Sequence, residues 1–479
     1  MKCMVSVFLL LGCLLLNPSP SRSQTEDQNL HKYWHYRQRL VRDFTVVGAD
    51  SGQSTPAGIR NIWNGYGMHY GDAPVYAGYY IGTLSTEYAL LSRHQQKTDP
   101  TLSELYYALQ ALERLETSAE KSWNIYNGQA PSTGYMLEDD VPADFCQLNS
   151  KRLNRLVTDS TYTPGKGLCG RVDNVISPHT LADKFNNTVS QDHIANLLVG
   201  LALCTRFVGD SLAFHDVITG QERKYDFRSE ANVLTNRIMH YMRDKPFGGI
   251  SWTLHRPDGT ALGNVKGGIA VFDSYGFAKA GAAITGKSYL NFSSRFFHLY
   301  WNCIYALRIM RINQDNLLFG LELSAIGDSW HGMGKKSRTL KRILQGGDYN
   351  ASFIPGLYAA NHFGWDLYYA SAFCLLHPSQ PRTRFLDTLH LSRMKQIMNS
   401  APQEGPFFHG GKDTAAYGWS GSSGRFYDKP PDQALGKPSF PGNYNGLDYM
   451  LFFNFYRLLT EEDPSLPLYE VSLEFTGTY

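Results

Sequence analysis

The sequence has little charge and none of the common catalytic motifs. Charged residues make up 18% of the 479 residues, and the formal net charge is +2. Basic residues cluster only in the short run 334–342, which is typical of a solvated face and not of a nucleic-acid footprint. There is no Gly-x-Ser-x-Gly elbow, His-Glu-x-x-His, paired Cys-x-x-Cys or phosphate-loop pattern. These absences argue against nucleic-acid partners and against the enzyme classes that those motifs mark.

Long apolar runs are missing after the first residues. Lys2 is followed by an apolar stretch over 5–16 and by small residues at 21–23, which predicts a signal peptide at 1–23. Residues 10–13 also resemble a lipoprotein box, in which Cys13 would be lipidated. The mature chain is therefore predicted to be secreted or periplasmic, with a lipid anchor at Cys13 as the alternative. No later stretch reaches the roughly 18 apolar residues that a membrane span needs.

Cysteine is scarce as well. The chain has seven cysteines, and Cys146 and Cys169 lie in one long loop of a protein that is predicted to be exported. These two are candidates for a disulfide, whereas the later cysteines sit in apolar helical runs and are expected to be buried. No cysteine has the spacing of a metal site. We expect neither a metal nor another cofactor.

Glycine and aromatic residues, in contrast, are plentiful in helical surroundings. The chain holds 44 glycines, and aromatic residues make up 13% of it. Asp72 precedes Pro74, which predicts an N-cap and a helix that starts near Ala73. Gly78 and Gly82 weaken that helix and predict a second helix packed closely against it. Strand signals are few, so the predicted fold class is all-α.

The helical pattern extends over most of the chain without a domain boundary. Residues 24–60 lack sustained periodicity and are predicted to form an N-terminal arm, and residues 61–479 to form a single domain. The loop at 124–187 is too long for a passive connector and is predicted to be functional, with a solvated acidic turn at 138–140. Further helices are expected at 101–123, 191–208, 229–243, 269–284, 293–311, 352–376, 384–398 and 444–459.

Three of the helix starts carry similar motifs. They are Gly71-Asp72…Tyr76-x-Gly78-x-Tyr80, Ser190-x-Asp192-His193…Leu197-Leu198-x-Gly200-Leu201 and Asn443-Tyr444-Asn445-Gly446…Asp448-Tyr449. These stretches resemble the inner helices of six-hairpin (α/α)-toroid proteins, a superfamily that includes glycoside hydrolases and polysaccharide lyases. The resemblance implies an (α/α) toroid of antiparallel helical hairpins, with long loops and a carbohydrate-binding cleft at one end.

Asp72 and Asp192 are the predicted catalytic pair. Glycosidic hydrolysis needs two carboxyl groups, roughly 5–5.5 Å apart for retention and 6.5–9.5 Å for inversion. Glu87 cannot serve with Asp72, because about 22 Å of helix separates them. Asp192 starts another helix, and the inner helices of a toroid begin at the same end. The competing interpretation is that both acids only stabilise helix N-termini.

Aromatic side chains are predicted to form the sugar-binding surface. One face of the first helix carries Tyr76, Tyr80, Thr83 and Glu87, and an aromatic loop precedes this helix. A polar and aromatic face beside such a loop predicts a solvent-filled cleft that binds sugars. The predicted substrate-binding residues are Trp63, Tyr66, Tyr70, Tyr76, Tyr80, Trp252, Trp330, His331, His362 and Trp419.

Two other functions remain open from the sequence. The cluster of Asn361, His362 and nearby tyrosines resembles the residues of toroid polysaccharide lyases, which act on uronate-containing glycans. A glycan-binding protein without catalysis is the third interpretation, in which the carboxylates serve only as caps. The sequence gives no indication of the oligomeric state.

Overall fold

A computed structural model of the chain describes residues 22–60, 67–153, 175–176, 184–244, 251–260, 262, 273–298, 322–327, 363–379, 382–384, 386–403, 405–408 and 442–460. Helix dominates these ranges and strand is minor, so the predicted all-α class is confirmed. The toroid stays a prediction. The disulfide does too, since Cys146 is buried and Cys169 lies outside the described residues.

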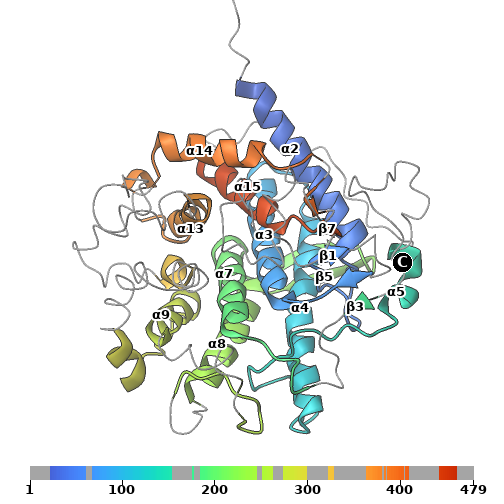
Figure 1. Ribbon diagram of the computed structural model, residues 1–479, viewed down its shortest axis with the longest axis vertical. Helices are drawn as coiled ribbons and strands as arrows, with labels where there is room; N and C mark the ends of the chain where they lie inside the picture. The colour runs from blue at the N-terminus through green and yellow to red at the C-terminus, as the bar shows by residue number, and fades with distance from the viewer. Residues whose placement is uncertain are drawn as a thin grey trace, which may run out of the picture.

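The α-helices of the described ranges include α2 (Arg22–Arg39), α3 (Ala73–Arg93), α4 (Asp99–Ser122), α5 (Phe145–Leu148), α6 (Ser150–Leu153), α7 (Gln191–Phe207), α8 (Phe227–Asp244), α9 (Ser274–Thr285), α13 (Phe363–Leu376), α14 (Thr388–Asn399) and α15 (Leu447–Thr460). A π-helical turn, η1 (Leu40–Phe44), extends α2, and η7 (Arg382–Arg384) is a 3-10 turn. Figure 1 shows α3, α7 and α15 toward the middle, with α2, α4, α8, α9, α13 and α14 around them.

Helices α3 and α7 pack with their backbones in contact. A Cβ atom on Gly78 would lie 2.3 Å from the carbonyl oxygen of Asn196, and one on Gly200 would lie 2.4 Å from the carbonyl oxygen of Gly78. The close contact predicted from Gly78 is therefore confirmed. A Cβ atom on Gly82 would meet Leu203, further along both helices, so the two helices run parallel. Their N-termini consequently lie side by side.

A small sheet joins the segments that lead into the central helices. Its strand order is β3 (Val175–Ile176), β2 (Met68–His69), β1 (Ile59–Arg60), β7 (Gly442–Tyr444) and β6 (Phe407–Phe408). In antiparallel register, Ile59 faces His69 on one side and Tyr444 on the other. Because β2 leads into α3 and β7 leads into α15, the sheet holds these two helix starts at the same end of the molecule.

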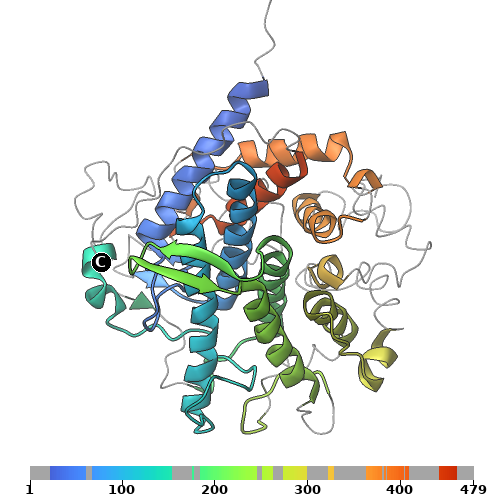
Figure 2. The ribbon, with the colours of Figure 1, turned by 180° about the vertical axis from the view of Figure 1, so that it is seen from behind.

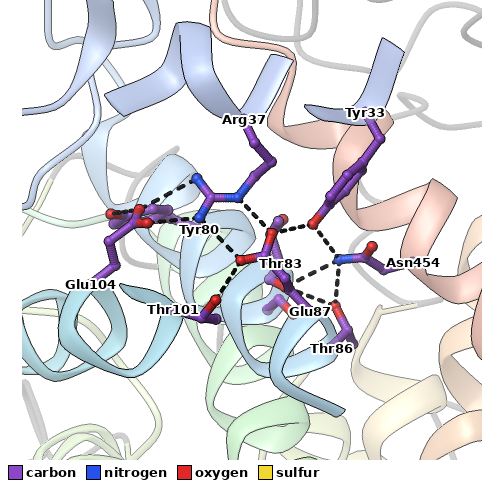
Figure 3. Close-up of polar contacts among 10 residues, drawn as sticks. Tyr33, Arg37, Tyr80, Thr83, Thr86, Glu87, Thr101, Glu104 and Asn454 are labelled. Carbon is purple, nitrogen blue, oxygen red and sulfur yellow. Dashed lines mark hydrogen bonds and ion pairs between the residues drawn. The ribbon is translucent and has the colours of Figure 1, made fainter. Parts of the chain in front are cut away.

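The N-terminal region is helical, contrary to the prediction of an irregular arm. Helix α2 inserts Arg37, which is fully buried, between two carboxylates: Nε lies 2.6 Å from Glu87 and Nη2 lies 2.7 Å from Glu104. Figure 3 shows how this Arg37 network joins α2, α3, α4 and α15; its members are Tyr33, Arg37, Tyr80, Glu87, Thr101, Glu104 and Asn454. Helix α2 was not predicted because its buried face carries polar and aromatic side chains, so its sequence shows no apolar periodicity.

The same network overturns the interpretation of the polar face of α3. Tyr80 and Thr83 are 0% exposed and Glu87 is 1% exposed. The hydroxyl of Tyr80 donates to Glu104 at 2.6 Å, and that of Thr101 donates to Glu87 at 2.7 Å. This face therefore binds α2 and does not line a wet cleft.

A β-hairpin that the sequence did not predict covers α4. Strand β4 (Leu212–Asp216) pairs with β5 (Gln221–Tyr225) in antiparallel register, and Figure 2 shows the hairpin lying across the helices. The alternation of apolar and polar residues that marks a strand is hidden in the sequence, because β5 consists mostly of polar residues. None of the helices in the described ranges is long and apolar enough to cross a membrane.

Candidate functional site

Asp72 stands at the start of α3 but does not cap it. Its backbone is left-handed, with φ 61° and ψ 29°, and its side chain makes no hydrogen bond to the helix N–H groups. The carboxylate turns instead toward α7, where its Oδ1 lies 3.2 Å from Nε2 of His193. The side chain is 31% exposed, and no described residue donates a hydrogen bond to Oδ2. One oxygen of Asp72 is thus held and the other is open.

His193 occupies the third position of α7 and is held at both ring nitrogens. The N–H group of Ser190 donates to Nδ1 at 3.2 Å, as part of a capping box. Because Nδ1 accepts that bond, the ring carries its proton on Nε2, which donates to Asp72. The imidazole is only 4% exposed. It therefore has no ring nitrogen left for a ligand.

The loop after α4 supports Asp72 from the other side. Glu138 Oε1 accepts a hydrogen bond from the backbone N–H of Asp72 at 3.1 Å. The loop is itself fixed by Asn187, whose Oδ1 accepts from the backbone N–H groups of Glu138 at 2.7 Å and Asp139 at 3.1 Å. The left-handed backbone of Asp72 is consequently held by a segment that is distant in sequence.

The predicted solvated acidic turn at 138–140 is wrong, because all three acids are buried. Glu138 is 3% exposed, Asp139 is 0% exposed and Asp140 is 2% exposed. Arg114, on α4, lies 2.5 Å from Asp140 and compensates its charge. These three acids are therefore part of the buried interior at the end of the molecule that carries Asp72, and they do not face solvent.

Asp192, the second predicted carboxyl, lies next to His193 in the first turn of α7. The Ser190 hydroxyl donates to its Oδ1, and its backbone oxygen accepts from the side chain of Asn196 at 2.9 Å. Asp192 is partly exposed, as Asp72 is. Since α3 and α7 begin side by side, both predicted carboxyl groups belong to one end of the molecule.

Three carboxylates act on His193. Burial lowers the pKa of His193, but its hydrogen bond to Asp72 and the charges of Asp192, Glu138 and Asp72 raise it to about 9. Nε2 carries a proton in both the neutral tautomer and the charged ring, so donation to Asp72 persists in both states, whereas only the neutral ring can accept from the Ser190 N–H group. His69, on β2, also senses Asp72: burial lowers the pKa of His69, and the Asp72 carboxylate opposes that shift.

The donor set was tested for its fit to a metal ion. Asp72, Glu138 and His193 each offer a ligand atom, and these atoms lie within 4.8 Å of one another. A histidine binds a metal through a nitrogen without a proton. Removing the proton from Nε2 would place it on Nδ1, opposite the Ser190 N–H group at 3.2 Å. The residues therefore fit a hydrogen-bonded carboxylate site better than a metal site.

The predicted sugar-binding residues fall into two groups. Trp63, Tyr66, Trp330, His331, His362 and Trp419, like Asn361, lie outside the described residues. Tyr70, Tyr76, Tyr80 and Trp252 are at most 2% exposed. Trp252, for example, donates from Nε1 to Asn291 at 3.1 Å within the core. These four side chains fill the interior, so they are not carried into the functional proposal below.

His193, Glu138 and His69 were not predicted to belong to the functional site. A signal for His193 was present, because Ser190-x-x-His193 has the spacing of a capping box with histidine in place of glutamate. Glu138 could not be found in this way, since its contact with Asp72 is made across a long loop. His69 precedes the first helix on a strand too short to show alternation.

Comparisons of the chain with protein-family models, with curated proteins and with solved structures gave no match.

Proposed function

We propose that the protein is an exported carbohydrate-active enzyme, a glycoside hydrolase that uses Asp72 and Asp192 as its carboxyl pair. The observation that carries this proposal is the position of Asp72. A carboxylate that serves only the helix would accept from the N–H groups of the first turn. The side chain of Asp72 makes none of those bonds. Its Oδ1 is hydrogen-bonded to buried His193 and its backbone N–H to buried Glu138, while Oδ2 accepts no hydrogen bond from a described residue.

The chemistry requires one carboxyl group to protonate the glycosidic oxygen as its bond to the sugar carbon breaks. The other carboxylate either removes a proton from the attacking water or bonds to the sugar carbon itself. Asp72 and Asp192 are partly exposed side chains at adjacent helix starts, in a region whose other acids are buried. This arrangement suits a pair that meets a substrate while its surroundings stay fixed.

Two features of the chain support the carbohydrate assignment. The motif at the start of α3 recurs in related form at the starts of α7 and α15, as in the inner helices of (α/α)-toroid enzymes. The leader at 1–23, which lies outside the described residues, has the pattern of export. Extracellular or periplasmic polysaccharides are accessible to such a protein.

The test follows reducing ends and unsaturated-uronate absorbance together on a panel of polysaccharides and oligosaccharides. Release of reducing ends without absorbance supports the hydrolase. Asp72→Asn and Asp192→Asn should each lower the rate by about 100- to 10,000-fold, the usual contribution of acid–base groups. Full activity in either variant would remove that residue from the pair.

The two alternative functions have distinct outcomes in the same assay. A polysaccharide lyase that uses Asn361 and His362 would release reducing ends with absorbance, and both residues lie outside the described ranges. A glycan-binding protein would bind one member of the panel without turnover, and its affinity would not depend on the protonation chemistry of Asp72.

A further inference from the structure

Two carboxyl groups lie in the interior without a basic partner. Glu322, in the helical segment 322–327, is 2% exposed, and Asp448, in the first turn of α15, is 3% exposed. The hydroxyl group of Tyr369 donates to Oε1 of Glu322 at 2.5 Å. Oδ1 of Asp448 accepts from the backbone N–H group of Tyr449 at 2.8 Å, and Oδ2 is buried and accepts from no described residue. Neither carboxyl group forms an ion pair within the part of the chain that the structure describes.

We propose that Glu322 and Asp448 form a buried acid pair that keeps its protons in the folded protein, so that the fold is stable in acid and weakens as the pH rises. An ionised carboxylate in the interior costs much free energy unless a cation compensates it, and a bound proton removes that cost. This property of the fold does not depend on whether the protein hydrolyses glycans. An exported protein that carries such a pair is suited to an acidic medium.

Tyrosines join the acid pair where α3, α13 and α15 meet. Tyr368, on α13, lies edge-on to Tyr79, on α3, with ring centroids 6.1 Å apart, and it stacks on Phe452, on α15, at 5.5 Å. Burial raises the pKa of Tyr79 and of Tyr368, and the charges of Glu322 and Asp448 add to both shifts. Both acids therefore face the same phenol groups. Because Tyr79 belongs to the helix that Asp72 precedes, the acid pair acts on the packing of the helix that carries the proposed site.

The titration of the pair follows from its burial. Burial raises the pKa of Glu322 to about 8, against the hydrogen bond from Tyr369 and with the added charge of Asp192. Burial likewise raises the pKa of Asp448 to about 8, against hydrogen bonds from backbone N–H groups. In the unfolded chain both groups titrate near about pH 4. Between about pH 4 and about pH 8 the folded chain therefore binds more protons than the unfolded chain, and stability falls as the pH rises.

The basic groups on the elements packed around the pair have other partners. On α2 and α14, Lys32 donates to the backbone oxygen of Met398 and Arg39 to that of Tyr444, while Arg37 and His390 pair with acids of their own. His377, on α13, and Lys279, on α9, lie at the far end of the segment from Glu322, beside residues 325–327. The charge that acts on Glu322 from α7 is the negative charge of Asp192, which favours the protonated form.

Glu322→Gln and Asp448→Asn test the pair, because each amide is uncharged at every pH and has nearly the shape of the protonated acid. Urea denaturation should be measured at intervals between about pH 5 and about pH 8. We expect the folding equilibrium constant of each variant to rise relative to that of the parent, by about tenfold per pH unit, because the parent must hold one more proton at that position. A constant ratio in either variant would overturn the pairing.

Asp140→Asn is the matched control. Asp140 is 2% exposed, as the pair is, but it is compensated by Arg114 at 2.5 Å. Its amide variant should be less stable than the parent across the same pH range and should not gain on it as the pH rises. Equal gains in Asp140→Asn and in the two test variants would contradict the proposal, since they would show that compensation by a cation makes no difference.

Infrared spectra test the protonation state without unfolding the protein. In mildly acidic buffer, the parent should show the C=O stretch of protonated carboxyl groups, and Glu322→Gln and Asp448→Asn should each reduce that band. Its absence from the parent would overturn the proposal even if neither variant folds. No glycan is needed for either measurement, so a silent glycan panel would remove the proposed hydrolase and leave the acid pair in place.

Discussion

Among the described residues, the clusters around Arg37 and around His193 each place carboxylates about one nitrogen-bearing side chain, but they differ in how far solvent reaches those carboxylates. In the Arg37 network, Arg37, Glu87 and Glu104 are at most 1% exposed, and both carboxylates accept bonds from the guanidinium group and from a hydroxyl group. Around His193, the support is equally buried, but Asp72 is 31% exposed and one of its oxygens is open. The first cluster is closed to solvent, as a structural joint requires, and the second leaves one carboxylate oxygen open, as the proposed catalytic role of Asp72 requires.

The largest contrast is expected when one carboxylate of each cluster is neutralised, because one variant should lose activity and the other stability. Asp72→Asn is expected to lower hydrolysis about 100- to 10,000-fold with little change in unfolding. Glu104→Gln should do the opposite, costing about 1–3 kcal/mol because it disturbs buried partners, with the rate unchanged. Rates and urea denaturation of both variants check this. Equal losses of activity would abolish the distinction between the clusters.

Removal of the cation tests the closed cluster directly. Arg37→Met leaves Glu87 and Glu104 buried without their guanidinium partner, and we expect the free energy of unfolding to fall by about 3–5 kcal/mol. Urea denaturation measures the loss. A Met variant as stable as the parent would show that the network is not what fastens α2 to the rest of the fold.

The close contact between α3 and α7 can be disturbed to test whether the relative position of the two helices matters for activity. Gly78→Ala would place a Cβ atom 2.3 Å from the carbonyl oxygen of Asn196, so the helices must separate. We expect a loss of about 1–3 kcal/mol in stability. The rate should fall as well, since Asp72 and His193 stand on different helices. Gly220→Ala is a control in open space, although its φ of 69° adds some strain. A stability loss in Gly78→Ala with no loss of rate would mean that the site tolerates movement of α3.

The smallest effect is expected at the start of α14, where Asp387 and His390 form a capping box like that of Ser190 and His193 on α7. Asp387 caps α14 by accepting from the N–H group of His390 at 3.0 Å, and its side chain is 58% exposed. Asp387→Ala should cost about 0.5–2 kcal/mol and leave hydrolysis intact. Thermal unfolding and the glycan assay measure both quantities. A loss of hydrolysis there would indicate that the capping box matters to activity in its own right.

Local signals in the sequence located the helices that carry the site. Asp72 before Pro74 placed the start of α3 at Ala73, and Ser190 placed the start of α7 at Gln191, because caps and first-turn prolines act within a few residues. Gly78 predicted the close approach of a second helix for the same reason. The positions of both proposed carboxyl groups were therefore available from the sequence.

The residues that surround Asp72 could not be predicted from the sequence, because they come from segments that are distant along the chain. Glu138 reaches Asp72 only after a long loop folds back, and Asn187 fixes that loop through its backbone. Helix α2 was missed because its polar residues are buried by partners on other helices. Propensity and periodicity describe neighbours along the chain, and neither reports a buried ion pair between distant segments.

The pairing of β1 with β7 has a consequence for how the protein reaches its working state. Ile59, just ahead of the site, pairs in antiparallel register with Tyr444, near the other end of the described residues. Contacts between such distant residues form late, because a very long loop must close first. A chain that is being synthesised from its N-terminus lacks this contact until residue 444 has emerged. A chain that ends before β7 would keep the residues of α3 but lose the strand that pairs with β1.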